Sequence, residues 1–515
     1  MGAQQSKASA ETAAINEKLV IERLQALQMR PKTRTGIDDD ENGEYVCVEK
    51  AETKAARRYV PQQPDLAVAK VKEWEHELLQ DPKNRLALSA LSSADPKAVL
   101  TSRAAGIKDQ QIFNVKIDFE GGPITNQRQS GRCWLFASTN VFRVALMRRH
   151  HLDKFELSQA YLFFWDKLEK ANFFLEQILD TVDEELDGRL MQSLLAAPVN
   201  DGGQWDMVYN LVVKYGLCPQ VLYPDSFNAQ SSAVINSLIT TKLREDALIL
   251  RDMAAESSSG IAETKEKMMR EIHLILTLTL GPPPSPTEKF TWSYADKNGK
   301  ACTLTTTPVD FAAELSTSYS VRCTNSNPIT AFSLVNDPRN EYMTHLTVDR
   351  LNNIASPSSR PITYANVSMP VMKAACIAML KANLPIFFGC DVGKYSDRFS
   401  GIMDTNLIDY ELGFNVKLNL SKSQRLQVNE SAMTHAMVLT AVHLDDKGQS
   451  VRWRVQNSWG ETAGTEGWFV MSDKWMDEFV YQAVVEPRFV GKDVLAVLKQ
   501  KPKVLPLWDP MGALA

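Results

Sequence analysis

The sequence has few of the residues that bind metals or form disulfides: seven cysteines and seven histidines are scattered through 515 residues. No C-x-x-C pair occurs and no spacing fits a zinc site, so we expect no metal site. No organic cofactor is implied either. An apolar leader and any run of ~18 apolar residues are also lacking, which argues against secretion and against a membrane span. Free thiols in a chain without a leader favour an intracellular, reducing compartment.

An excess of basic charge is lacking too. The formal net charge is −5, which argues against a whole-protein electrostatic footprint for nucleic acid. The composition itself is that of a globular protein, with 44% hydrophobic and 23% charged residues. At ~100–200 residues per domain, the length predicts two to four domains, or one large domain that carries insertions.

The first residues, Met-Gly-Ala-Gln-Gln-Ser, fit the M-G-x-x-x-[ST] pattern for N-myristoylation at Gly2. One acyl chain beside Lys7 gives at most weak, reversible membrane association. The alternative is a solvated tail, because residues 1–60 are nearly free of aromatic side chains. Acidic residues make a mitochondrial transit peptide a poorer fit. We therefore expect a cytoplasmic protein, with a mitochondrial or a reversibly membrane-associated protein as the alternatives.

Helical and strand patterns follow from about residue 59 onward. Apolar spacing predicts helices within 65–95, 131–148, 157–197, 233–280 and 369–382. Ser130 is the expected N-cap of the second of these helices. A proline-rich breaker follows residue 280. Strands are expected within 288–368, at 385–390 and within 435–485.

Cys133 is the first candidate for chemistry. It begins an apolar helix, where free backbone N–H groups and the helix dipole stabilise a thiolate. A neighbouring imidazolium would lower the pKa of the thiol further. Gln127 lies on the preceding loop, where its side-chain amide could donate to an oxyanion together with the backbone N–H of Cys133.

Two further segments carry the residues that such a nucleophile needs. His435 opens an apolar strand that would hold an imidazole rigidly, and Asn457 ends the following strand. Asn457 can accept from the imidazole N–H and so fix its tautomer, while Trp459 could shield that hydrogen bond from water. Taken singly, each residue has an ordinary explanation: a buried Cys as a small hydrophobe, a satisfied core His, an Asn in a turn. Gln, Cys, His and Asn in this order and these settings favour catalysis.

The three segments resemble the papain superfamily of cysteine peptidases, whose landmarks are Gln-x5-Cys-Trp, Thr-His-Ala and Asn-Ser-Trp-Gly. A closer similarity, over roughly residues 60–515, is to the bleomycin hydrolase family. It is carried by Ser130-Gly-Arg-Cys-Trp-Leu-Phe-Ala137, Asp201-Gly-Gly-Gln-Trp-Asp206, Phe388-Gly-Cys-Asp-Val-Gly-Lys394 and Leu505-Pro-Leu-Trp-Asp-Pro-Met-Gly-Ala-Leu-Ala515.

The resemblance implies an α+β, papain-like fold with a helical lobe, an antiparallel β lobe, and helical and hook-like insertions. About 300 residues separate Cys133 from His435, against ~130–150 in ordinary papain-like enzymes, so the insertions lie largely between them. We expect five segments: a flexible extension (1–60), the helical lobe with its insertion (61–280), a hook-like lobe (281–368), the β lobe (369–500) and a C-terminal tail (501–515).

The resemblance also implies the roles of the residues. Cys133 is the nucleophile, His435 the general base and acid, Asn457 the residue that orients it, and Gln127 the oxyanion donor. Gly202 and Gly203 match the glycines that let a substrate backbone approach closely. The tail, ending at Ala515, is expected in the active-site cleft, where a terminal carboxylate favours a substrate amine and so makes an aminopeptidase.

The implied activity is a thiol-dependent aminopeptidase of broad specificity that acts through an acyl-enzyme, with bleomycin and homocysteine thiolactone as further substrates. The implied assembly is a homohexamer with its active sites facing a central channel. Two alternatives remain open. A Cys-His acyl transferase or transglutaminase would share the catalytic residues, and a nucleic-acid-binding regulator would bind single strands weakly through a local basic surface.

Overall fold

The computed structural model describes residues 65–317 and 331–514. The chain divides into two compact units, Met1–His76 and Glu77–Ala515. The described part of the first unit is residues 65–76, which contain the start of α2 (Val68–Gln80). The predictions for Gly2, for residues 1–60 and for Ala515 lie outside the described residues.

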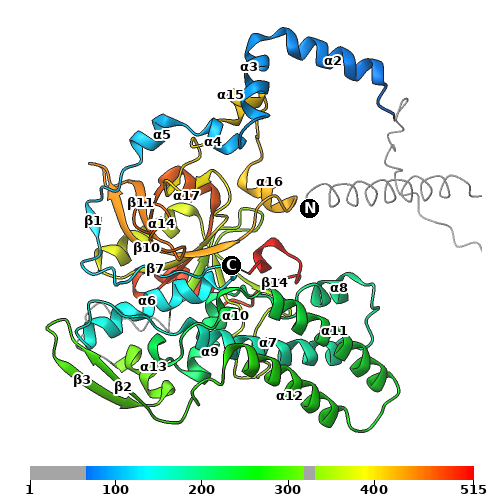
Figure 1. Ribbon diagram of the computed structural model, residues 1–515, viewed down its shortest axis with the longest axis vertical. Coiled ribbons are helices and arrows are strands. Elements are labelled where there is room, and N and C mark those ends of the chain that lie inside the picture. The colour runs from blue at the N-terminus through cyan, green and yellow to red at the C-terminus, as the bar shows by residue number, and fades with distance from the viewer. Residues whose placement is uncertain (1–64, 318–330, 515) are drawn as a thin grey trace, which may run out of the picture. The chain divides into compact units, whose positions relative to one another are not determined.

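The second unit is built on a 12-stranded mixed sheet with the order β14-β5-β6-β4-β13-β7-β10-β11-β12-β9-β8, and β1 pairs with β10 (Figure 1). Its strands are β1 (Val115–Lys116), β4 (Phe332–Val335), β5 (Thr344–Val348), β6 (Tyr364–Asn366), β7 (Ile386–Cys390), β8 (Ser396–Asp397), β9 (Ile402–Met403), β10 (His435–Leu444), β11 (Ser450–Gln456), β12 (Trp468–Ser472), β13 (Val480–Val485) and β14 (Lys503–Leu505). A separate hairpin pairs β2 (Phe290–Ala295) with β3 (Ala301–Thr306).

Helices form the second layer, in which α7, α11 and α12 pack against one another, and α6 contacts both α7 and strand β10 (Figure 1). The helices within residues 133–317 are α6 (Cys133–Arg149), α7 (Gln159–Asp180), α8 (Arg189–Ala196), α9 (Trp205–Tyr215), η1 (Gln220–Leu222), α10 (Phe227–Gln230), α11 (Ala233–Ala255), α12 (Ile261–Leu280) and α13 (Pro308–Thr317). The remaining helices of this unit are α3 (Pro82–Leu91), α4 (Pro96–Leu100), α5 (Arg103–Lys108), α14 (Met369–Lys381), α15 (Tyr410–Phe414), α16 (Lys422–Gln427), α17 (Asp473–Phe479), η4 (Pro487–Phe489), α18 (Lys492–Val497) and η5 (Pro510–Gly512).

Strand β10 lies near the middle of the sheet and is almost completely buried. Nine of its ten residues are buried, because α6 contacts the strand as well as α14, and β7 and β11 pair with its edges. A strand covered on its faces is expected to be a nearly continuous apolar run, as His435-Ala-Met-Val-Leu-Thr-Ala-Val-His-Leu444 is. The helix that begins at Cys133 and the strand that begins at His435 therefore pack directly together.

Two local expectations differ from the structure. Ser130 does not cap α6: Arg132 occupies the N-cap position, and the Ser130 hydroxyl donates to the Gln127 carbonyl at 2.6 Å. The segment 281–368 also divides in two. Its hairpin lies apart from the main sheet, whereas β4–β6 belong to that sheet, because β4 and β6 are buried throughout and pair with each other and with β13 or β5.

Candidate active site

Cys133 is the first residue of α6 and is buried, with 2% of its surface exposed. Its thiol lies within reach of backbone N–H groups of Ala436 and Trp134. Since Ala436 directly follows His435, the contact places the thiol beside the start of β10. Two segments about 300 residues apart in sequence thus meet at one point.

His435 is held by Asn457 on its far side. The His435 Nε2 lies 2.9 Å from Asn457 Oδ1, and the Asn457 Oδ1 also accepts from the Ser458 N–H at 2.7 Å. The Trp459 ring covers the imidazole, with the ring centroids 4.9 Å apart. This geometry assigns the proton to Nε2 and leaves Nδ1 as the acceptor nitrogen.

Gln127 is fixed by hydrogen bonds at both ends of its amide. Its Nε2 donates to the Ser130 carbonyl at 2.7 Å, and its Oε1 accepts from the Ser458 hydroxyl at 2.7 Å. The second hydrogen of Nε2 remains as a donor. The backbone N–H of Cys133, at the N-terminal end of α6, is a second donor. The pair satisfies the chemical requirement of an oxyanion hole.

Burial favours the uncharged forms of both Cys133 and His435. It raises the pKa of the Cys133 thiol to about 11, although N–H groups of Ala436 and Trp134 act in the opposite direction. Burial likewise lowers the pKa of His435 to about 4, although the hydrogen bond that His435 donates to Asn457 acts in the opposite direction. The sequence predicted a lowered thiol pKa from the helix end, and burial outweighs that effect.

Gly202 and Gly203 lie where no side chain fits. A Cβ on Gly203 would lie 2.5 Å from the Trp134 ring, and a Cβ on Gly202 would lie 2.8 Å from Leu514 of the C-terminal tail. The Trp134 Nε1 donates to the Asp201 carbonyl at 2.6 Å, which ties this strip to the helix of the nucleophile. The two glycines thus lie beside the first turn of α6, and Gly202 contacts the C-terminal tail.

Buried charges that the sequence reasoning missed hold this edge in place. Asp201 accepts from Gly131 N at 2.9 Å and from Lys167 Nζ at 2.7 Å. Lys170 donates to the Gly202 carbonyl at 2.6 Å and pairs with Asp166 at 2.7 Å. Burial alone would raise the pKa of Asp201, but Lys167 and the hydrogen bonds hold it well below its usual range. Lysines within the apolar run of α7 were the only signal in the sequence.

We expect Lys167→Met to destabilise the fold by about 3–5 kcal/mol, because it leaves the Asp201 carboxylate buried without its counter-ion. Lys167 has no exposed side-chain surface. Urea unfolding measures the change. Arg270→Ala is the matched control, since its pair with Glu266 is largely exposed and contributes about 0–1 kcal/mol. A loss for Lys167→Met no larger than that of the control would contradict this role.

The C-terminal tail is docked along its length. β14 pairs in parallel with β5, Met511 is buried, and Asp509 accepts from Arg339 at 2.7 Å. Gln204 Nε2 donates to the Ala513 carbonyl at 2.6 Å. The tail therefore follows the same strip, Gly202–Gln204, that lies beside the Cys133 helix.

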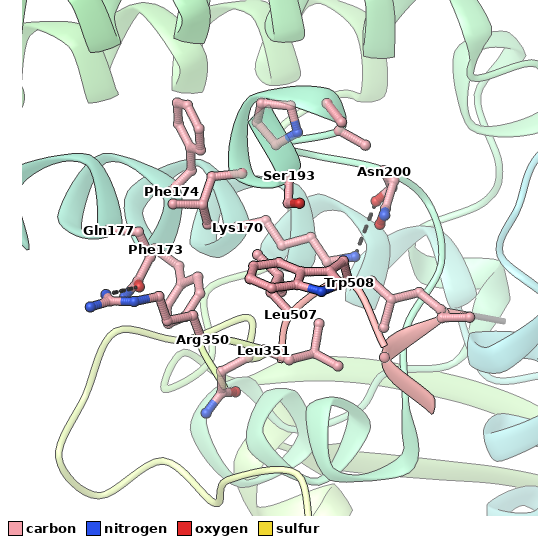
Figure 2. Close-up of a pocket in the computed structure, with 18 residues that line it drawn as sticks. Lys170, Phe173, Phe174, Gln177, Ser193, Asn200, Arg350, Leu351, Leu507 and Trp508 are labelled. Carbon is pink, nitrogen blue, oxygen red and sulfur yellow. Dashed lines mark hydrogen bonds between the residues drawn. The ribbon is translucent and has the colours of Figure 1, made fainter. Parts of the chain in front are cut away.

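Beside the tail is a cavity of about 390 Å³, one wall of which is formed by Leu507, Trp508 and Gly512–Leu514. Figure 2 shows Trp508 lying across its middle, near Lys170 and Leu351. The guanidinium of Arg189 lies 4.6 Å from the Trp508 ring centroid. The Trp508 indole thus holds this part of the C-terminal tail against α8.

Among the described residues, other histidines and cysteines have structural positions, and one of them, Cys390, lies beside the site. His150 is the C-cap of α6 and bonds Glu314 and Tyr294. Cys218 and Cys376 are buried core residues, and Cys390 is the register partner of His435 on β7. Within residues 65–317 and 331–514, no cluster of three or more His, Cys, Asp or Glu is placed to hold a metal ion. No helix in these same ranges has the length and apolarity to cross a bilayer.

The comparisons with known proteins agree on one family of cysteine peptidases. Residues 65–512 match the model of the Peptidase C1-like family. The chain is 40% identical to mitochondrial cysteine proteinase 1 of Saccharomyces cerevisiae over 459 residues, 87% of this chain and 92% of the relative. It is 41% identical to human bleomycin hydrolase over 460 residues, 87% and 98% of the two chains. The crystal structure of PepW from Lactobacillus rhamnosis superposes with a TM-score of 0.82 at 37% identity, covering 88% of this chain and all of the other.

Proposed function

The chain belongs to the Peptidase C1-like family and is a cysteine peptidase of the bleomycin hydrolase type, and from this premise we propose that it is an aminopeptidase of broad specificity. One observation carries the proposal. The last residues of the chain lie along Gly202–Gln204, with Leu514 against Gly202 and the Ala513 carbonyl bonded to Gln204. A peptide that extended upstream of the cut would need this same strip, so only a short N-terminal portion fits.

In the proposed mechanism the Cys133 sulfur attacks the carbonyl carbon of the first peptide bond, while His435 Nδ1 takes the thiol proton. The negative oxygen of the tetrahedral intermediate accepts from Gln127 Nε2 and the Cys133 N–H. The imidazolium then gives its proton to the leaving amine, which departs as the C–N bond breaks. Asn457 keeps Nε2 protonated and the ring aimed throughout.

Water completes the cycle. His435 takes a proton from a water molecule, the resulting hydroxide attacks the thioester carbonyl, and Cys133 leaves and recovers its proton. The released products are the free N-terminal residue and the shortened peptide. By similarity to human bleomycin hydrolase, we include an amide bond of bleomycin among the substrates. The family resemblance of the sequence adds homocysteine thiolactone, through the same acyl-enzyme.

A matched pair of peptides tests the aminopeptidase proposal. One peptide has a free N-terminus and the other is the same sequence with an acetylated N-terminus. We expect the free peptide to be cleaved at its first bond with a kcat/KM roughly 10–100-fold higher, because one charge-assisted hydrogen bond to the amine is lost on acetylation. Mass spectrometry of the products gives the bond cut and the rate. Equal rates, or a preference for the blocked peptide, would overturn the proposal.

Two further points rest on the sequence and the family. We propose a homohexamer, which light scattering of the purified protein tests by its mass. Acylation at Gly2 and an unmodified, solvated tail are the two alternatives for the N-terminus, and an intact-mass measurement of the native protein distinguishes them. One relative is named as mitochondrial, so fractionation of cells decides between that compartment and the cytoplasm.

A further inference from the structure

A second cavity, of about 780 Å³, lies beside the catalytic strand pair and away from the tail. This volume is within the range typical of small-molecule and peptide side-chain sites, ~300–1,000 Å³. Its walls come from α4, the loop after β7, the segment from α15 to α16, and the end of α17. None of the lining residues belongs to the C-terminal tail or to α6–α12.

The position of this cavity relative to the reacting groups follows from the strand register. His435 pairs with Cys390 at the end of β7, and the wall residues Gly393–Tyr395 follow Cys390 directly. Glu430, also in the wall, precedes His435 by one short segment. Asp391 ties these two segments together, since it accepts from Ser431 at 2.8 Å. The cavity therefore adjoins the two segments that flank His435, and none of its lining residues belongs to the strip Gly202–Gln204 that the tail contacts.

The charge of the lining is positive although the protein as a whole is negative. Four cationic side chains line it, against one carboxylate, that of Glu430. The cations are Lys97, Lys394, Lys417 and Arg425. Three of the cations already have a partner: Lys394 pairs with Glu430 at 2.5 Å, Lys417 with Glu411 at 3.1 Å, and Arg425 with Glu478 at 2.6 Å. Glu411 and Lys417 are largely exposed, and Glu478 lies outside the lining. A concave surface lined by one sign of charge concentrates ligands of the opposite sign.

The floor of the cavity is aromatic and held in place. Tyr395 stacks on Phe479 with centroids 5.9 Å apart and meets Tyr410 edge to face at 5.6 Å. Tyr395 has φ +46°, in the left-handed region that aromatic residues rarely adopt. The preceding carbonyl, that of Lys394, accepts from the Trp475 indole at 2.7 Å. A strained backbone kept in place by its surroundings is characteristic of binding sites.

We propose that this cavity, lined by Lys394, Lys417 and Tyr395, binds a carboxylate on the part of a peptide substrate that leaves after cleavage. The proposal rests on the proposed function, because the tail blocks the upstream side and the remaining peptide must extend past His435. The carboxylate has two sources: the C-terminus of a short peptide, or an acidic side chain within a longer one. The aromatic floor accommodates the apolar part of the residue that carries it.

Pairs of otherwise identical peptides of increasing length test this inference, one with a free C-terminal carboxylate and its twin with an amide. At low ionic strength we expect the carboxylate twin to have a KM about fivefold lower at one peptide length, the effect of one partly exposed ion pair. The difference should disappear in the double variant Lys394→Gln/Lys417→Gln and at high salt. Amidated peptides with a Glu at successive positions test the side-chain source. If an acidic side chain is the ligand, KM should fall by the same factor when the Glu is at one particular position.

Lys447→Gln is the matched control, since Lys447 is an exposed lysine on the β10–β11 turn and should change neither twin. A neutral aminoacyl arylamide, whose leaving group has no carboxylate, should be hydrolysed equally by all variants. Equal KM values for the twins and the Glu series in the wild type would overturn the inference, as would a preference that survives in the double variant. Failure of the wild type to hydrolyse the arylamide as well as the peptides would instead overturn the proposed function.

Discussion

Replacing Cys133 by Ala is expected to lower kcat by on the order of 10⁴-fold or more, because the substitution removes the atom that forms the acyl-enzyme. The fold should survive. Cys133 is the first residue of α6, and the buried charges, Trp134 and the tail that define the site do not depend on its sulfur. Peptide hydrolysis, measured with a free-amine substrate, gives the rate. Circular dichroism and urea unfolding check the fold, with an expected loss of about 1 kcal/mol for a small cavity.

Cys376→Ala is the matched control for this experiment. Cys376 is fully buried in α14, with no His or Asn bonded to it, so its loss creates a similar cavity without touching the site. We expect Cys376→Ala to retain wild-type kcat and KM with a comparable loss of stability. Turnover by folded Cys133→Ala within tenfold of the wild type would show that another residue is the nucleophile.

The family and the papain-like fold predicted from the sequence are confirmed. The prediction worked because Cys133, His435 and Asn457 lie within short segments whose local pattern is distinctive: a helix start, a strand start and a strand end. Such patterns depend on neighbouring residues and can be recognised in a linear sequence. The pairing of β4 and β6 with the main sheet could not be predicted, because it depends on contacts distant in sequence.

The support of the site was missed for a related reason. Lys167 and Asp201 pair deep in the interior, and a lysine on a helix is normally assigned to the solvent face. The contact of Gln204 with Ala513 joins residues 309 positions apart and is made by a neutral amide. The raised pKa of Cys133 also required the structure, since it depends on the burial of the thiol between α6 and β10 and not on the helix end.

Deleting residues 511–515 is expected to convert the enzyme from an aminopeptidase to an endopeptidase. The deletion removes Leu514 from Gly202 and the Ala513 carbonyl from Gln204, and so frees the strip for substrate residues upstream of the cut. It also removes the terminal carboxylate proposed to pair with the substrate amine. Trimming of free N-termini should fall roughly 10–100-fold, the effect of one lost charge-assisted hydrogen bond. N-acetylated peptides should now be cleaved internally, as mass spectrometry of the fragments would show.

A shorter deletion separates specificity from stability. Met511 is buried and Asp509 pairs with Arg339, so loss of residues 511–515 also removes part of the anchor. A chain that ends at Gly512 keeps both anchors, together with Trp508 on Arg189, and loses only the residues that reach Gly202 and Gln204. It should therefore unfold at nearly the wild-type urea concentration and still cleave blocked peptides internally. If this folded variant retains the wild-type preference for free N-termini, the tail does not determine the specificity. The upstream boundary of the cleft must then be formed by the strip itself.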